Sequence, residues 1–188
     1  MKKIFSVLAL LALTVAVLAQ EPVKKFEIKS GIVKNVTEVM GQKMESTLYF
    51  DNYGAQQATT MKVATPAGQV EITTIVKDGK TYVVNTTSKQ VQEIPTQEEV
   101  NYLNLTDEIK AKFKVNEAGT ETLDGKVCTK YTEVIEQNGQ KVDATVWVWK
   151  GFPIKTELSV SGMKATTNAV EFNENAVVLP IVFEIPKF

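Results

Sequence analysis

The sequence predicts a mainly β protein: a curved antiparallel sheet or incomplete β-barrel of about ten strands, with a helical insertion covering the concave face. Three observations support this prediction. Val and Thr dominate the chain after residue 20, and apolar positions alternate with a period of two. Two-residue turn signals such as Asp78-Gly79 and Asn138-Gly139 join consecutive segments. One segment alone, near residues 97–113, has helical spacing.

The first four expected strands are defined by apolar residues that share one face. They carry, in order, Phe26, Ile28 and Ile32; Met44, Leu48 and Phe50; Met61 and Val63; and Val70, Ile72 and Val76. Asp78-Gly79 then predicts a tight hairpin into residues 80–85, because both central positions of such a turn need positive φ. A sixth strand, residues 90–94, follows a polar turn.

The helical insertion has two start signals. Thr96-Gln-Glu-Glu99 has the spacing of a capping box, and Thr106 opens a second candidate first turn. Ile109 and Phe113 lie four residues apart and would share a helix face. We expect one helix or two short ones over residues 97–113.

Strand patterns resume after the helix. The expected segments are residues 127–136, 142–150, 154–160, 163–173 and 177–183. A sheet of this size must curl, and its concave face either fills with side chains, receives a helix or holds a ligand. No repeat or Pro/Gly-rich linker divides the chain, so residues 20–188 are expected to form a single domain.

The first 19 residues have the features of a secretory signal peptide. Lys2 and Lys3 precede an apolar run that ends in Val17-Leu18-Ala19. This run is shorter than the roughly 20 residues of a membrane-spanning helix, and charged residues follow it directly. We therefore expect residues 1–19 to be removed, leaving a monomeric periplasmic or secreted bacterial protein with no transmembrane segment.

The residue inventory excludes several function classes. The chain has no His, its 21 basic residues are all Lys, and Cys128 is its only Cys. His-based catalysis, His- or Cys-cluster zinc sites and intramolecular disulfides are therefore excluded. Two of the lysines lie in the leader, so the mature chain has 19 Lys against 22 acids and no electrostatic basis for binding nucleic acid. We expect no enzymatic activity, no cofactor and no metal.

Several short motifs stand in a recognisable order. Asp78-Gly79-Lys80-Thr81-Tyr82 leads through a polar turn to Lys89-Gln90-Val91; after the helical segment come Trp149-Lys150-Gly151-Phe152-Pro153-Ile154-Lys155 and a closing Phe183-Glu-Ile-Pro186. In this order the chain resembles the periplasmic outer-membrane lipoprotein carrier superfamily, the LolA-like proteins. The resemblance implies an incomplete antiparallel β-barrel whose hydrophobic concave side is covered by helices. It also implies a role in shielding lipid or lipoprotein acyl chains.

An acyl-chain ligand needs a concave apolar wall and no catalytic group. The residues expected to line such a groove are Phe26, Ile28, Leu48, Phe50, Trp147 and Trp149, and those expected to form its lid are Ile109 and Phe113. Alternation alone favours a filled core, which is the commoner outcome. Two functions stay open: a non-catalytic carrier of a lipidic ligand, and a secreted protein–protein interaction module with a filled core.

We predict that the mature protein begins at Gln20 and accumulates outside the cytoplasm, because the leader is cleaved on export. N-terminal sequencing and the intact mass of protein purified from its own host would check this. Recovery of the full-length chain, beginning at Met1, in the membrane fraction would contradict it.

Overall fold

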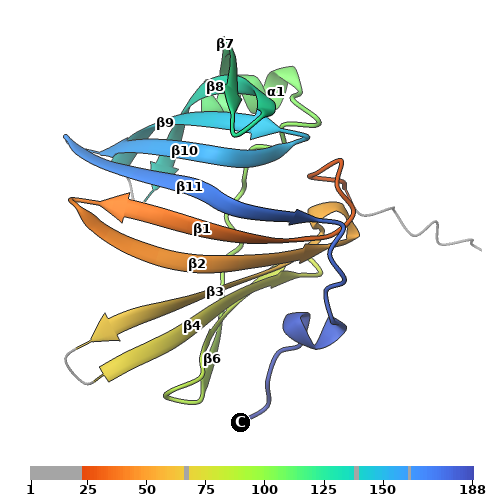
Figure 1. The fold of residues 1–188 in the computed structure, drawn as a ribbon, viewed down its shortest axis with the longest axis vertical. Coiled ribbons are helices and arrows are strands. Elements are labelled where there is room, and N and C mark those ends of the chain that lie inside the picture. Colours follow the sequence, from red (N-terminus) through yellow and green to blue (C-terminus); the bar gives the residue numbers. More distant parts are fainter. Residues whose placement is uncertain (1–22, 66–67, 138–139, 161) are drawn as a thin grey trace, which may run out of the picture.

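An open antiparallel sheet of eleven strands forms the body of the protein (Figure 1). The computed structural model describes residues 23–65, 68–137, 140–160 and 162–188. The strands are β1 (Gly31–Val39), β2 (Gln42–Asp51), β3 (Gln56–Thr65), β4 (Gly68–Lys77), β5 (Lys80–Asn85), β6 (Gln90–Ile94), β7 (Asn116–Leu123), β8 (Lys126–Gln137), β9 (Gln140–Trp149), β10 (Phe152–Val160) and β11 (Met163–Glu174). The described residues also form one α-helix, α1 (Asp107–Phe113), and 3₁₀ turns at Asn52–Gly54 and Pro180–Phe183.

The strand order is β6-β5-β4-β3-β2-β1-β11-β10-β9-β8-β7. Two meanders, β1–β6 and β7–β11, are joined where β1 pairs with β11, from Gly31 opposite Glu174 to Val39 opposite Ala165. Strands β6 and β7 therefore lie at the two ends of the sheet. The predicted fold class is confirmed: the protein is mainly β and antiparallel, and the sheet is open rather than a closed barrel.

The hairpin predicted at Asp78-Gly79 is present. Both residues have positive φ, 51° and 74°, as this turn requires. Strands β5 and β6 have the predicted bounds, 80–85 and 90–94. The Asn138-Gly139 turn lies outside the described residues, but the strands it was predicted to join, β8 and β9, are paired up to Gln137 opposite Gln140.

The prediction that the first strand begins at Phe26 is wrong, because β1 begins at Gly31. The backbone that precedes β1 forms hydrogen bonds with turns and not with a neighbouring strand. The N–H of Phe26 donates to the carbonyl of Tyr53 at 3.1 Å, and the N–H of Glu27 donates to that of Lys150 at 3.0 Å. These bonds direct the side chains of Phe26 and Ile28 into the core, where both are buried.

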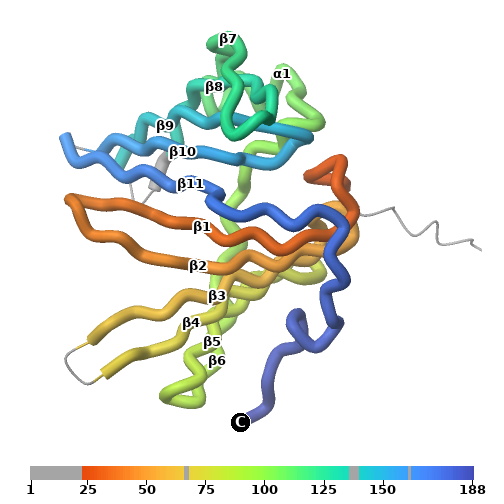
Figure 2. Tube along the Cα trace, viewed as in Figure 1, coloured from red at the N-terminus to blue at the C-terminus, as the bar shows by residue number. Residues whose placement is uncertain are grey.

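The predicted helix over residues 97–113 is shorter than expected, because only Asp107–Phe113 is helical. Its N-cap is the second predicted start: the Thr106 hydroxyl oxygen accepts from the N–H of Ile109 at 3.2 Å. Thr96 does not cap a helix, since its hydroxyl donates to the Gly79 carbonyl at 2.9 Å. Residues 95–106, named the strap below, run without regular structure behind the sheet from β6 to α1 (Figure 2).

The strand predicted over residues 177–183 is also absent. Pro180, which has no N–H to give to a ladder, begins a 3₁₀ turn there. Phe183 is only 1% exposed and packs against Ala58, Ile75 and Val84 on the convex face of β3–β5. The C-terminal segment therefore covers one face of the sheet, opposite the strap (Figure 1).

Strand β7 was not predicted. Its sequence, NEAGTETL, has exposed side chains at every position except the half-buried Leu123. Without a buried face it shows no apolar alternation, so only its pairing with β8 identifies it as a strand.

An aromatic cluster of Phe26, Phe50, Phe152 and Phe172 lies at the centre of the largest core group. The rings of Phe26 and Phe50 are 5.0 Å apart and edge to face, and Phe26 and Phe152 have the same separation. Phe152 contacts Phe172 at 4.9 Å. Edge-to-face packing of this kind adds to the free energy gained from burial. The cluster joins the segment before β1 to β2, β10 and β11.

Replacing Phe50, which is fully buried, by Ala should lower the free energy of unfolding by about 3–5 kcal/mol, because it leaves a cavity among three rings. Urea denaturation would measure the loss. The matched control is Phe188→Ala at a 58% exposed ring, expected to change stability by about 0.5 kcal/mol or less. Equal losses for the two variants would contradict this assignment of the core.

Candidate functional site

A cavity of about 410 Å³ lies between the concave face of the sheet and the strap. Small-molecule pockets typically measure roughly 300–1,000 Å³, so a ligand of modest size fits. Its apolar lining comes from the segment before β1, strands of both meanders, the strap and α1: Phe26, Leu48, Val100, Phe113, Ile135, Val146 and Phe152. The aromatic cluster contributes two of these rings and thus forms part of the cavity wall.

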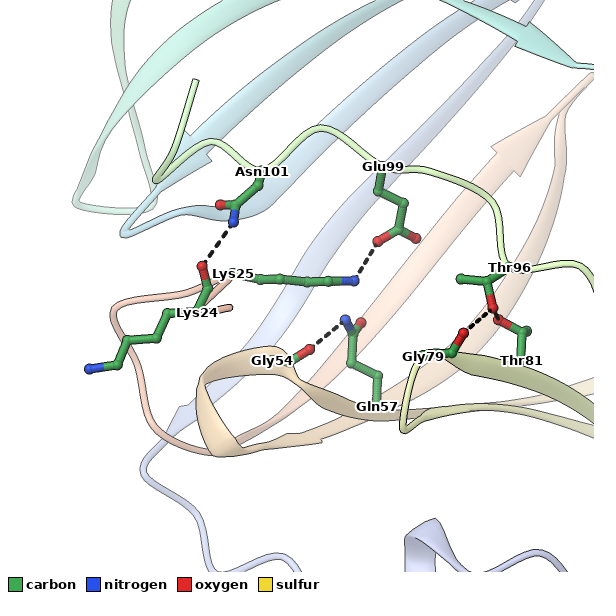
Figure 3. A network of polar contacts seen from close by, with 9 residues as sticks. All are labelled: Lys24, Lys25, Gly54, Gln57, Gly79, Thr81, Thr96, Glu99 and Asn101. Carbon is green, nitrogen blue, oxygen red and sulfur yellow. Dashed lines mark hydrogen bonds and ion pairs between the residues drawn. The ribbon is translucent and has the colours of Figure 1, made fainter. Parts of the chain in front are cut away.

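The strap is tied to the sheet along its length (Figure 3). At its start, the Thr96 hydroxyl bonds to the β4–β5 turn and lies 3.0 Å from the Thr81 hydroxyl. Further along, the Lys25 ammonium donates to a Glu99 carboxylate oxygen at 3.0 Å, and the Asn101 side-chain amide donates to the Lys24 carbonyl at 2.9 Å. These contacts hold the strap against the segment that precedes β1.

The β9–β10 turn also meets the strap. Gly151 has φ +77°, and a Cβ there would lie 2.6 Å from the Lys25 carbonyl oxygen and 2.7 Å from the Leu103 side chain. A side chain larger than hydrogen would therefore push the strap away. The predicted strands 142–150 and 154–160 left a connection at residues 151–153; β10 begins at Phe152, and this close approach was not predicted.

The end of the strap is fixed to β8 by one buried polar contact. The Tyr102 hydroxyl donates to Glu133 Oε2 at 3.1 Å, and the Tyr102 ring stacks on Tyr131 at 5.3 Å. Glu133 is 6% exposed and belongs to the cavity lining. Burial raises the pKa of the Glu133 carboxyl, and the Tyr102 hydrogen bond opposes this rise. Burial, followed by the charge of Glu133, raises the pKa of Tyr102 as well.

Three carboxylates line the cavity, and they differ in their partners. Glu98 forms an ion pair with Lys112, and Glu99 forms one with Lys25. Both of these acids are exposed for more than half of their side-chain surface. Within the described part of the chain, Glu133 has the Tyr102 hydroxyl as its hydrogen-bond partner and no lysine.

Of the eight predicted site residues, Phe26, Leu48 and Phe113 line the cavity. Phe26 and Leu48 belong to the wall, and Phe113, 8% exposed, comes from α1. Ile109, the other predicted lid residue, is half-buried on α1 and is not part of the lining.

The other four predicted groove residues lie in the core group around the aromatic cluster. Phe50 and Ile28 are buried in it, and Trp149 packs edge to face on Phe172 at 5.6 Å. Trp147 lies on the face opposite Val146, with its ring NH donating to Glu121 Oε2 at 2.7 Å. Val146, not Trp147, lines the cavity, so the apolar rather than the aromatic set of β9 faces it.

Sequence reasoning missed Glu133 and Tyr102. One signal for Glu133 was available: it stands between Tyr131 and Ile135 at period two, so an acid occupies a face that is otherwise apolar. Tyr102 had no such signal, because its role depends on the path of an irregular segment. Cys128 is fully buried, and burial raises the pKa of its thiol.

No family model matches the sequence, and no curated protein sequence is similar to it. Solved structures do resemble it. An uncharacterized conserved protein from Thermus thermophilus aligns with a TM-score of 0.56 and 11% identity over 86% of this chain and 88% of that one. A chain of the Pseudomonas aeruginosa MucA/MucB complex aligns with a TM-score of 0.54 and 13% identity over 84% of this chain and 56% of that one.

A putative outer membrane lipoprotein-sorting protein domain from Vibrio parahaemolyticus aligns with a TM-score of 0.43 and 12% identity over 85% of this chain and 91% of that one. MucB by itself aligns with a TM-score of 0.51, and this chain spans 57% of its length. The matches above a TM-score of 0.5, which include the Thermus protein and MucB, show that the chain shares their fold, and at the level of the fold they confirm the predicted LolA-like resemblance.

None of the helices in the described residues is long and apolar enough to span a membrane. No group of three or more Cys, Asp or Glu side chains in those residues is arranged to hold a metal ion.

The raised pKa of Glu133 predicts a pH dependence of stability. The folded state holds this proton more tightly than the unfolded state, so stability falls as pH rises from the ordinary pKa of 4.5 through the raised one. Glu133→Gln removes the effect. In urea denaturation at pH 4 and pH 8, the variant should gain stability relative to wild type at the higher pH.

The control for this comparison is Glu38→Gln on β1, where the side chain is exposed. Its difference from wild type should stay within about 0.5 kcal/mol at both pH values. If Glu133→Gln lost as much stability relative to wild type at pH 8 as at pH 4, the carboxyl would not have the environment described above.

Proposed function

We propose that this protein is a non-catalytic periplasmic or secreted carrier that holds the acyl chain of a lipid or lipoprotein in the cavity beneath the strap. The observation that supports this most directly is the cavity itself, which lies on the concave face and has an apolar lining drawn from both meanders. A flexible hydrocarbon chain needs such a wall and few polar contacts. The LolA-like fold supports the same proposal.

The strap supplies a means of entry. It is held against the sheet and the segment before β1 by a few hydrogen bonds and the Lys25–Glu99 ion pair rather than by a strand ladder. Exposed ion pairs contribute little stability, about 1 kcal/mol or less each. A segment held in this way opens at a lower free energy than the strands do, so a ligand can enter without unfolding the sheet.

The alternative function is protein–protein interaction. MucB shares the fold and has been crystallised in complex with MucA. In this chain the C-terminal segment exposes several large apolar side chains, among them Val177, Leu179 and Ile181. Exposed apolar surface of this kind is typical of contact sites. Under this alternative the cavity would take up no lipid.

The two functions separate in one experiment. Wild-type protein should bind the neutral apolar fluorescent probe N-phenyl-1-naphthylamine, and Leu48→Trp should reduce the binding at least tenfold, because the indole would occupy the cavity. Fluorescence titration would measure the affinity. The matched control is Thr47→Trp, which places the same ring on the opposite face of β2 and should leave the affinity within about twofold.

Lid contacts would be tested separately with Phe113→Ala. This change removes a cavity-lining ring from α1 and should alter probe uptake, while Phe183→Ala on the convex face should lower stability without altering uptake. Absence of probe binding to the wild type, with native lipid extraction also negative, would reject the carrier and leave the interaction function.

A further inference from the structure

We infer that Glu133 is a ligand-binding residue that selects amphiphiles with a cationic amine head group. This inference rests on the proposed function and adds to it the chemical class of the head group. It starts from a buried carboxyl group that belongs to the cavity lining and has no basic partner among the described residues.

The position of Glu133 is unusual for an acid. It is only 6% exposed, on the face of β8 that lines the cavity, and lies directly opposite the small side chain of Ala144 on β9. Burying a carboxyl costs free energy unless hydrogen bonds or an opposite charge compensate it. Tyr102 supplies one hydrogen bond, to Oε2.

The second carboxyl oxygen, Oε1, is available to a ligand. The hydrogen bonds found in the described residues give it no partner. Yet those residues contain no side-chain oxygen or nitrogen that is both fully buried and unpaired. Oε1 therefore keeps some accessible surface, and the side chain belongs to the cavity lining. In this proposal Oε1 accepts a hydrogen bond from a donor that enters the cavity.

The charge balance of the lining favours a cation as that donor. Lys25 and Lys112 are matched by Glu99 and Glu98, which leaves Glu133 as the one unmatched acid among the described charged residues that line the cavity. Burial lowers the local dielectric and strengthens an ion pair formed there. An ammonium group would neutralise the carboxylate and donate to Oε1, whereas an anionic head group would be repelled.

The inference is tested with three competitors of equal chain length: hexadecylamine, hexadecanol and hexadecanoate. Each is titrated at pH 8 into wild-type protein that holds the neutral dye N-phenyl-1-naphthylamine, and displacement of the dye measures its affinity. The amine should bind at least tenfold more tightly than hexadecanoate, because charge-assisted hydrogen bonds are the strong ones. Glu133→Gln, which keeps the shape and an acceptor for Tyr102, should weaken amine binding about tenfold and leave hexadecanol within about threefold.

Tyr102→Phe is the matched control. It removes the hydroxyl that ties the strap to Glu133 but leaves the carboxylate in place. The preference for the amine should persist in this variant, even if all three affinities change together. Loss of the preference in Tyr102→Phe as well as in Glu133→Gln would show that strap closure, not the carboxylate, sets it, and would overturn the inference.

The remaining outcomes separate the inference from the proposed function. If none of the three amphiphiles displaces the dye, the carrier function itself fails. If all three displace it equally, or hexadecanoate does so best, the carrier function stands and the role of Glu133 is wrong. The wild-type series alone decides this point, so a variant that failed to fold would not leave the question open.

Discussion

The arrangement of the whole structure depends on how the concave face of its open sheet is covered. Strands β6 and β7 lie at opposite ends of the strand order, so the curved sheet does not close around its concave face by itself. The convex face of β3–β5 is covered by the C-terminal segment, which inserts Phe183. The concave face is covered instead by the strap and α1, which leave a cavity of about 410 Å³ beneath them. An apolar face that is only partly filled is the physical basis for proposing a binding function.

The strap is attached by polar side-chain contacts and not by strand pairing. Thr96, Glu99 and Asn101 contact the turn at Gly79 and the segment before β1, and none of these contacts is part of a strand ladder. Thr96 also reaches the buried Thr81, and Tyr102 reaches the buried Glu133. A carboxyl in such a place lowers stability once it ionises, since burial raises its pKa. Proteins keep costly groups of this kind at functional sites more often than in ordinary cores.

The likeness to the Thermus protein and to the chain of the MucA/MucB complex concerns the fold alone. Identities of 11% and 13% accompany alignments over 86% and 84% of the chain, so the same sheet is built from different side chains. A fold of this kind can serve several functions, and the site must be argued from its own residues. Here those residues are an apolar wall, several uncharged polar side chains, the Lys25–Glu99 pair, Glu98 paired with Lys112 outside the lining, and the unmatched Glu133.

The sequence by itself determined the local structure. Period-two alternation identified most strands, and Asp78-Gly79 and Thr106 marked a turn and a helix start correctly, because these signals act over a few residues. The sequence did not show that Phe26 lies before the first strand and packs in the aromatic cluster. It also did not show which face of β9 lines the cavity. Only the tertiary structure decided that Val146 faces the cavity, because this depends on the direction in which the sheet curves. It also decided that Tyr102 meets Glu133, because these residues are 31 positions apart in the sequence and the path of the irregular strap brings them together.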